Sequence, residues 1–175
     1  MNDTVMSVVA IFLAGILMFI FPLMATADRS DDISQQAVQT ATTEFVDNIR
    51  STGKITLSKY DSFVQSLAET GNSYDVRMEV QILDESARKK TTEAASTKVG
   101  ENNYYTEYTS QISEILNTKG EYALKEGDII SVTIKNSNKT LGQTLRNFAY
   151  QVTGNDTYTI AAQHSGIVNV NAKNK

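Results

Sequence analysis

The stretch TVMSVVAIFLAGILMFIFPLMATA, from Thr4 to Ala27, decides the organisation of this chain because it contains no charged residue. As a helix rising about 1.5 Å per residue, these 24 residues would extend about 36 Å. A bilayer core is roughly 30 Å thick and needs about 20 apolar residues to cross. Gly15 and Pro22 fit this interpretation, since both residue types are commoner in membrane helices than in soluble ones. We therefore predict that residues 1–27 form an N-terminal transmembrane anchor.

A cleaved signal peptide is the alternative interpretation of this segment. Ala25-Thr26-Ala27 has the small-x-small form of a cleavage site. However, Met1-Asn2-Asp3 contains no Lys or Arg, and the apolar stretch is long for a signal peptide. A buried core helix is disfavoured, because such helices rarely run this far without a charge. A retained anchor is the favoured prediction.

The composition of the remaining residues predicts one domain. Residues 28–175 number 148, which suits a single domain. The net charge of −4 provides no basic surface, so no nucleic-acid partner is expected. The chain has no cysteine, which excludes disulfides, thiolate metal sites and cysteine nucleophiles.

The charges beside the apolar stretch bear on membrane topology. The positive-inside rule counts Lys and Arg close to the ends of a span. On the C-terminal side, Arg29 lies among three aspartates, and the next basic residue is Arg50. This side therefore lacks the positive excess that would retain it in the cytoplasm. We expect a single-pass protein with the 28–175 domain outside the cytoplasm.

An amphipathic pattern follows the apolar stretch without interruption. No Gly or Pro lies between Leu23 and Gly53, and Gly53 is a typical helix C-cap. We predict one long helix, with an amphipathic part over residues 28–53 that continues the anchor. A break at Asp28–Asp32, with an aspartate capping a new helix, is the alternative. The predicted apolar face comprises Ile33, Ala37, Ala41, Phe45 and Ile49, with Val38 and Val46 alongside.

Three further helices are predicted from apolar spacing and capping residues. They are a helix capped by Ser58 and Asp61 and ended by Gly71-Asn72, a helix over Tyr104–Asn117 with Tyr105 and Tyr108 on its buried side, and a short helix opened by Thr140 and Gln143.

Period-two alternation and β-branched runs predict the strands. They are Tyr74–Ile82, Ile129–Lys135, and the pair Thr157–Ala162 and Ile167–Val170, which would form a hairpin broken at Ser165-Gly166. The polar segment 84–103 is expected to be a loop. The predicted fold class is therefore α+β: a long N-terminal transmembrane-plus-amphipathic helix, then a small antiparallel sheet of three or four strands with helices on one face.

Few residues in the sequence suggest a catalytic or ligand-binding role. His164 is the only histidine, and the sequence nominates no nucleophile to act with it. Asp28, Asp31 and Asp32 lack the glycine and final glutamate of an EF-hand, so helix capping is the expected role. Glycine-rich phosphate-binding motifs are absent from the sequence. We therefore predict a non-enzymatic protein with no catalytic, cofactor-binding or metal-binding residue, no cofactor and no small-molecule substrate.

The order of these features resembles the type IV pilin-like proteins, in which an apolar helix continues into an amphipathic helix followed by a small sheet domain. EFVDNIRSTGKITLSKYDSFVQSLAETGNSYDVRMEVQ (Glu44 to Gln81) and EGDII (Glu126 to Ile130) look like minor pseudopilin-like proteins of Tad-type (Flp) pilus systems in Gram-positive bacteria. The resemblance covers most of the chain in layout and is specific over these two stretches. The apolar segment lacks the glutamate that pilins place in this helix, so no functional residue is carried over.

The resemblance implies a structural, membrane-anchored, pilin-like (pseudopilin) component of a Tad- or type IV-like pilus or secretion assembly at the cell surface. The implied partners are the membrane and other pilin-like subunits or pilus assembly proteins, contacted through the N-terminal helix. The alternative is a single-pass anchored extracytoplasmic ligand-binding or sensor domain that uses the loop 84–103 or the tyrosine-rich segment 104–117. An extracytoplasmic enzyme is the least supported, because no site is nominated.

Overall fold

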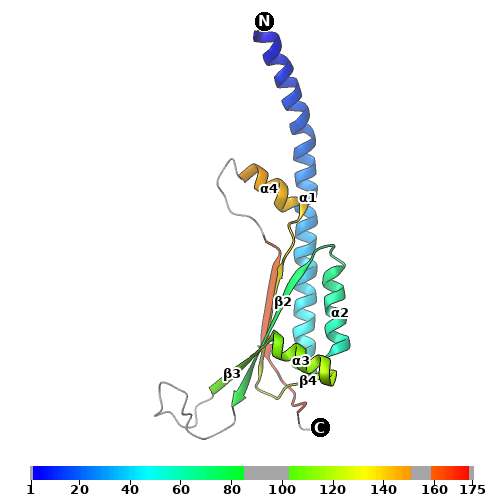
Figure 1. The fold of residues 1–175 in the computed structure, drawn as a ribbon, viewed down its shortest axis with the longest axis vertical. Coiled ribbons are helices and arrows are strands. Elements are labelled where there is room, and N and C mark those ends of the chain that lie inside the picture. The colour runs from blue at the N-terminus through cyan, green and yellow to red at the C-terminus, as the bar shows by residue number, and fades with distance from the viewer. Residues whose placement is uncertain (1, 85–102, 151–158, 174–175) are drawn as a thin grey trace.

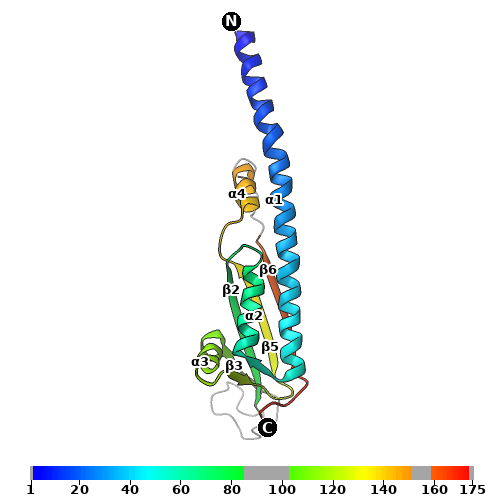
Figure 2. The ribbon, with the colours of Figure 1, turned by 90° about the vertical axis from the view of Figure 1, so that its right-hand side faces the viewer.

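A single helix, α1 (Asn2–Thr52), runs the length of the molecule (Figure 1). The computed structural model describes residues 2–84, 103–150 and 159–173. The domain gathers around the C-terminal half of α1, while the N-terminal half extends beyond it (Figure 2). The prediction of one long helix is confirmed, and the alternative with a break at Asp28–Asp32 is wrong.

The elements after α1 form two antiparallel sheets and three shorter helices in the described residues. The larger sheet has the order β3-β2-β5-β6, and the smaller one pairs β1 with β4. The general α+β architecture is as predicted. The bounds are β1 (Lys54–Thr56), α2 (Leu57–Ala68), β2 (Tyr74–Asp84), β3 (Asn103–Tyr108), α3 (Thr109–Lys119), β4 (Glu121–Ala123), β5 (Ile129–Asn136), α4 (Leu141–Tyr150) and β6 (Ala161–Ile167).

The larger sheet has one buried face and one face in solvent. On β2, Met78, Val80 and Ile82 are buried, whereas the alternate residues Arg77 and Glu79 are exposed. Such alternation is expected where only one face of a sheet is covered. Helices α1 and α2 lie on the same side of the sheet (Figure 1). They are joined by the stacked rings of Phe45 and Phe63, whose centroids are 4.3 Å apart.

The buried stripe of α1 differs from the predicted one in its first half. Ile33 was expected to face the domain, but its side chain is 60% exposed. Successive steps of four residues wind around a helix by about 40° each, so a stripe of that spacing drifts off the contact face. The observed stripe mixes steps of three and four residues, and it includes polar residues. It consists of Ala27, Asp31, Ser34, Val38, Thr42, Phe45, Val46 and Ile49.

The predicted helix over Tyr104–Asn117 is wrong in its first part. Residues up to Tyr108 form β3, which pairs with β2 so that Tyr105 lies opposite Ile82. Three tyrosines within five residues fit a pleated surface, and pairing with β2 decides between strand and helix. Helix α3 begins at Thr109, where the Tyr108 N–H donates to the Gln111 side chain at 2.9 Å. Tyr105 and Tyr108 are exposed rather than buried.

Two other local predictions are corrected. Helix α2 is capped by Thr56, not Ser58, because extended backbone at the end of β1 places the Thr56 hydroxyl at the first turn. Residues Ser165-Gly166 do not break a hairpin, since they lie inside the single strand β6. A Cβ at Gly166 would meet the Arg50 side chain, so this glycine leaves room for Arg50 of α1 to lie against β6. The segments 85–102 and 157–158, predicted as loop and strand start, lie outside the described residues.

Gly53 ends α1 as predicted. Its φ of +70° is the left-handed conformation that favours glycine, and its N–H donates to the Ile49 carbonyl at 2.8 Å. A side chain here would also meet the Val170 carbonyl oxygen at 2.5 Å. The chain therefore turns from α1 into β1 at a position where only glycine fits.

We expect Ile49→Ala to lower the free energy of unfolding by about 2–5 kcal/mol, because Ile49 is buried in the core and its truncation leaves a cavity. The matched control is Ile33→Ala, the same change on an exposed position of the same helix, with an expected effect within about 0.5 kcal/mol. Urea unfolding of the full chain in detergent, followed by near-UV circular dichroism of the tyrosines, measures both. Equal stability of the two variants would contradict the observed face of α1.

Candidate functional site

The N-terminal half of α1 exposes apolar side chains on all sides. Met18 and Phe19 are 77% and 80% exposed, although consecutive residues point about 100° apart on a helix. The structure has one helix that is long and apolar enough to cross a membrane in the residues it describes, and none of its most apolar window is buried. A helix that is apolar all round requires a nonaqueous environment, supplied by lipid or by other apolar helices.

A polar junction joins this apolar half of α1 to α4. The Gln143 N–H donates to the Thr140 hydroxyl at 3.0 Å, and the Thr140 N–H donates to Gln143 Oε1 at 3.1 Å. This is the predicted capping box. The Thr140 hydroxyl then donates to Asp31 Oδ2 at 2.8 Å, and both residues are buried. The first turn of α4 is thereby attached to α1.

A second contact lies one turn along α1. Arg146 Nε donates to Asp28 Oδ1 at 2.7 Å, and Arg146 Nη2 forms an ion pair with the same oxygen at 2.6 Å. Asp28 and Asp31 are three residues apart and therefore share a helix face. The prediction that these aspartates cap a helix is wrong, because α1 is continuous there and they hold α4 instead. Gly142 allows this approach, since a Cβ at that position would clash with Asp31.

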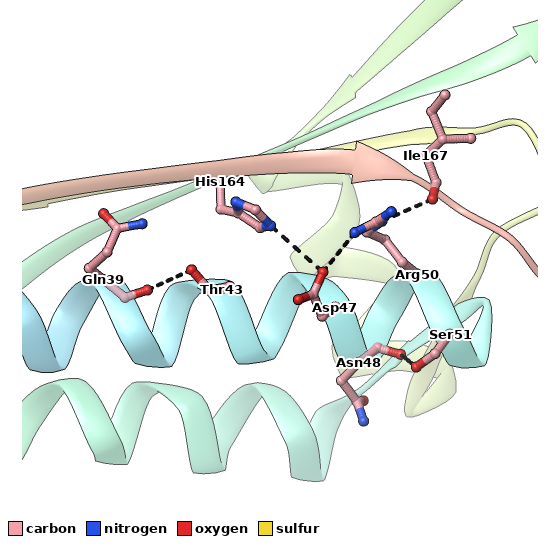
Figure 3. Close-up of polar contacts among 8 residues, drawn as sticks. All are labelled: Gln39, Thr43, Asp47, Asn48, Arg50, Ser51, His164 and Ile167. Carbon is pink, nitrogen blue, oxygen red and sulfur yellow. Dashed lines mark hydrogen bonds and ion pairs between the residues drawn. The ribbon is translucent and has the colours of Figure 1, made fainter.

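Helix α1 is also attached along β6, the edge strand of the larger sheet. The Gln35 side-chain amide donates to the Ala161 carbonyl at 2.6 Å and accepts from the Ala161 N–H at 2.9 Å. At the other end of the strand, Arg50 Nε donates to the Ile167 carbonyl at 3.1 Å (Figure 3). Side chains of α1 therefore satisfy backbone groups that an edge strand leaves open.

His164 faces this same contact between α1 and β6. Its Nε2 lies 3.7 Å from Asp47 Oδ1, and Asp47 accepts a 2.8 Å hydrogen bond from Arg50 (Figure 3). Its Nε2 has no hydrogen-bond partner among the described residues. The arrangement is that of a packing contact between helix and strand.

A buried phenol connects the smaller sheet to the larger one. The Tyr122 hydroxyl donates to Glu107 Oε2 at 2.7 Å. Burial raises the pKa of Tyr122 well above its usual range, and the hydrogen bond to Glu107 raises it further. The hydrogen bond between Tyr122 and Glu107 therefore joins β4 to β3.

Two open grooves lie along α1. One of about 480 Å³ is lined by Arg29, Ile33 and the end of α2, and another of about 460 Å³ opens between Leu23 and the start of α4. Within the described residues, no group of three or more His, Cys, Asp or Glu side chains could hold a metal ion. Exposed Tyr104, Tyr105 and Tyr108 lie on the edge strand β3.

We expect Asp31→Ala to loosen α4, because it leaves the buried Thr140 hydroxyl without its acceptor at a cost of about 1–3 kcal/mol. If α4 opens locally before cleavage, trypsin cleavage after Lys139 and Arg146 accelerates by about 5- to 150-fold. The control is Asp32→Ala, which removes an exposed carboxylate from the adjacent position. Unchanged cleavage of Asp31→Ala, measured by mass spectrometry of timed digests, would contradict the attachment of α4 through Asp31.

Comparison with known proteins does not assign the chain to a family. No model of a protein family matches it, no curated protein matches it, and no solved structure matches it.

Proposed function

We propose that this chain is a membrane-anchored, non-enzymatic, pilin-like component of a Tad- or type IV-like pilus or secretion assembly. The observation that supports this most directly is the division of α1. Its first half exposes apolar side chains on every side, and its second half packs on an antiparallel sheet, with no break between them. In the proposal, the first half contacts lipid and the helices of other pilin-like subunits or assembly proteins, and the sheet domain lies outside the cytoplasm.

The rigidity of the connection favours an assembly role over a tethered domain. A domain on a flexible linker takes many orientations relative to its anchor. Here the helical backbone continues through the junction, and Asp28 and Asp31 fasten α4 to it. Subunits that associate through the apolar half of α1 would therefore hold their sheet domains in one defined orientation. This property suits a repeating structure.

The absence of cysteine from the chain permits a topology test with single-cysteine variants. We expect Ser165→Cys, on the exposed face of β6, to react with a membrane-impermeant maleimide on intact cells. Asp3→Cys, at the opposite end of α1, should react only after the cells are permeabilised. The reverse pattern of labelling would place the domain in the cytoplasm and contradict the proposed location.

Photo-crosslinking in the native host tests the proposed partners. We expect benzoylphenylalanine at Phe19, which is 80% exposed, to give adducts with other membrane-embedded subunits that mass spectrometry identifies as pilin-like or pilus assembly proteins. The same amino acid at Gln163, on the solvent face of β6, is the matched control and should give few such adducts. If Phe19 yields lipid adducts alone, the assembly role is contradicted, and an anchored binding or sensor domain becomes the better hypothesis.

A further inference from the structure

Helix α4 lies beside α1 at the end of its apolar stretch. Figures 1 and 2 both show α4 alongside α1, at the end of the domain from which the apolar half extends. Ala27, the last residue of the apolar stretch, is buried where Gly142 approaches α1. Leu23 lies four residues earlier, about 6 Å along the helix axis. A bilayer that surrounds the apolar half of α1 therefore ends close to the first turn of α4.

Leu141 begins α4 and is 57% exposed. It lines the 460 Å³ groove together with Leu23, so the two leucines face the same open space. Lys139, at the rim of this groove, is also exposed. An exposed leucine beside a basic side chain fits the interface of a membrane, where the apolar residue enters the acyl region and the basic one reaches headgroups.

The acidic groups near this surface are already compensated. Asp31 is 4% exposed and accepts from Thr140, while Asp28 is paired with Arg146. Carboxylates that are buried or paired oppose contact with lipid less than free ones do. Arg29 and Asp32 lie exposed on α1 nearby and offset each other in charge. The surface therefore requires no particular headgroup charge.

We propose that Leu141 and the first turn of α4 form a membrane-contact surface at the lipid interface beside Leu23, where Leu141 reaches the acyl region. The occupant is lipid, because the groove that Leu141 lines is continuous with the apolar surface of α1. This inference rests on the proposed anchoring of α1. Helix α4 then acts as a second membrane contact that limits tilting of the domain about its anchor.

The chain contains no tryptophan, so a single introduced one reports its own surroundings. We expect Leu141→Trp, in full-length protein reconstituted into phosphatidylcholine vesicles, to emit at a shorter wavelength than the control Val64→Trp. We also expect brominated phosphatidylcholine to reduce its emission, because bromine quenches only indoles that contact the acyl chains. Val64 is a matched control because it is 39% exposed on α2, a helix of the sheet domain. Its emission should be unaffected by brominated lipid.

A third variant separates failure of this inference from failure of anchoring. Phe19→Trp lies in the apolar half of α1 and should be quenched whenever the helix is inserted. Quenching of Phe19→Trp without quenching of Leu141→Trp would overturn the contact surface and leave the anchoring intact. Short-wavelength emission of Leu141→Trp that brominated lipid does not reduce would indicate a protein neighbour and would also overturn it. Absence of quenching in both variants would overturn the anchoring and the contact surface together.

Discussion

The structure of the domain depends on the way α1 covers the open edge of the larger sheet. Gln35 and Arg50 are about 22 Å apart along the helix, and the backbone groups they bind, at Ala161 and Ile167, are about 20 Å apart along β6. This agreement lets α1 follow β6 from Ala161 to Ile167. Alternate residues of an edge strand turn their backbone groups outward, where unpaired groups would invite aggregation. The contact therefore orients α1 and protects the edge at once.

Polar residues in the buried stripe of α1 follow from the same requirement. Asp31 and Thr42 occupy positions that an ordinary amphipathic helix would fill with apolar residues. Each has a hydrogen-bond partner, Asp31 in the distant residue Thr140 and Thr42 in the Val38 carbonyl at 2.6 Å. A buried polar group is costly unless it is hydrogen-bonded, so such residues specify one arrangement of partners. Uniformly apolar residues would pack in several registers against the same sheet.

Much of this fold was predictable from local pattern, and the rest depended on distant pairing. Neighbouring residues alone predict four features: the continuity of α1, the alternation of β2, the β-branched run of β5 and the capping box of α4. The strand character of Tyr104–Tyr108 was not, because pairing with β2 decides it. The junction at Asp31 could not be predicted either, since its partner Thr140 is 109 residues away. For the candidate site, the exposed apolar half of α1 followed from composition, but its attachment to α4 did not.

The junction also bears on how deeply an anchor of this kind can enter a membrane. Moving a carboxylate such as Asp28 to the centre of a bilayer costs about 3 kcal/mol, so charged residues after an apolar stretch oppose further insertion. Here Asp28 is bonded to Arg146 of α4, and sliding α1 inward would have to carry α4 with it or break that pair. The residues that would set the depth of the helix are thus the ones that fix the domain to it. Depth and domain orientation are therefore coupled, and a substitution at Asp28 or Asp31 would alter both together.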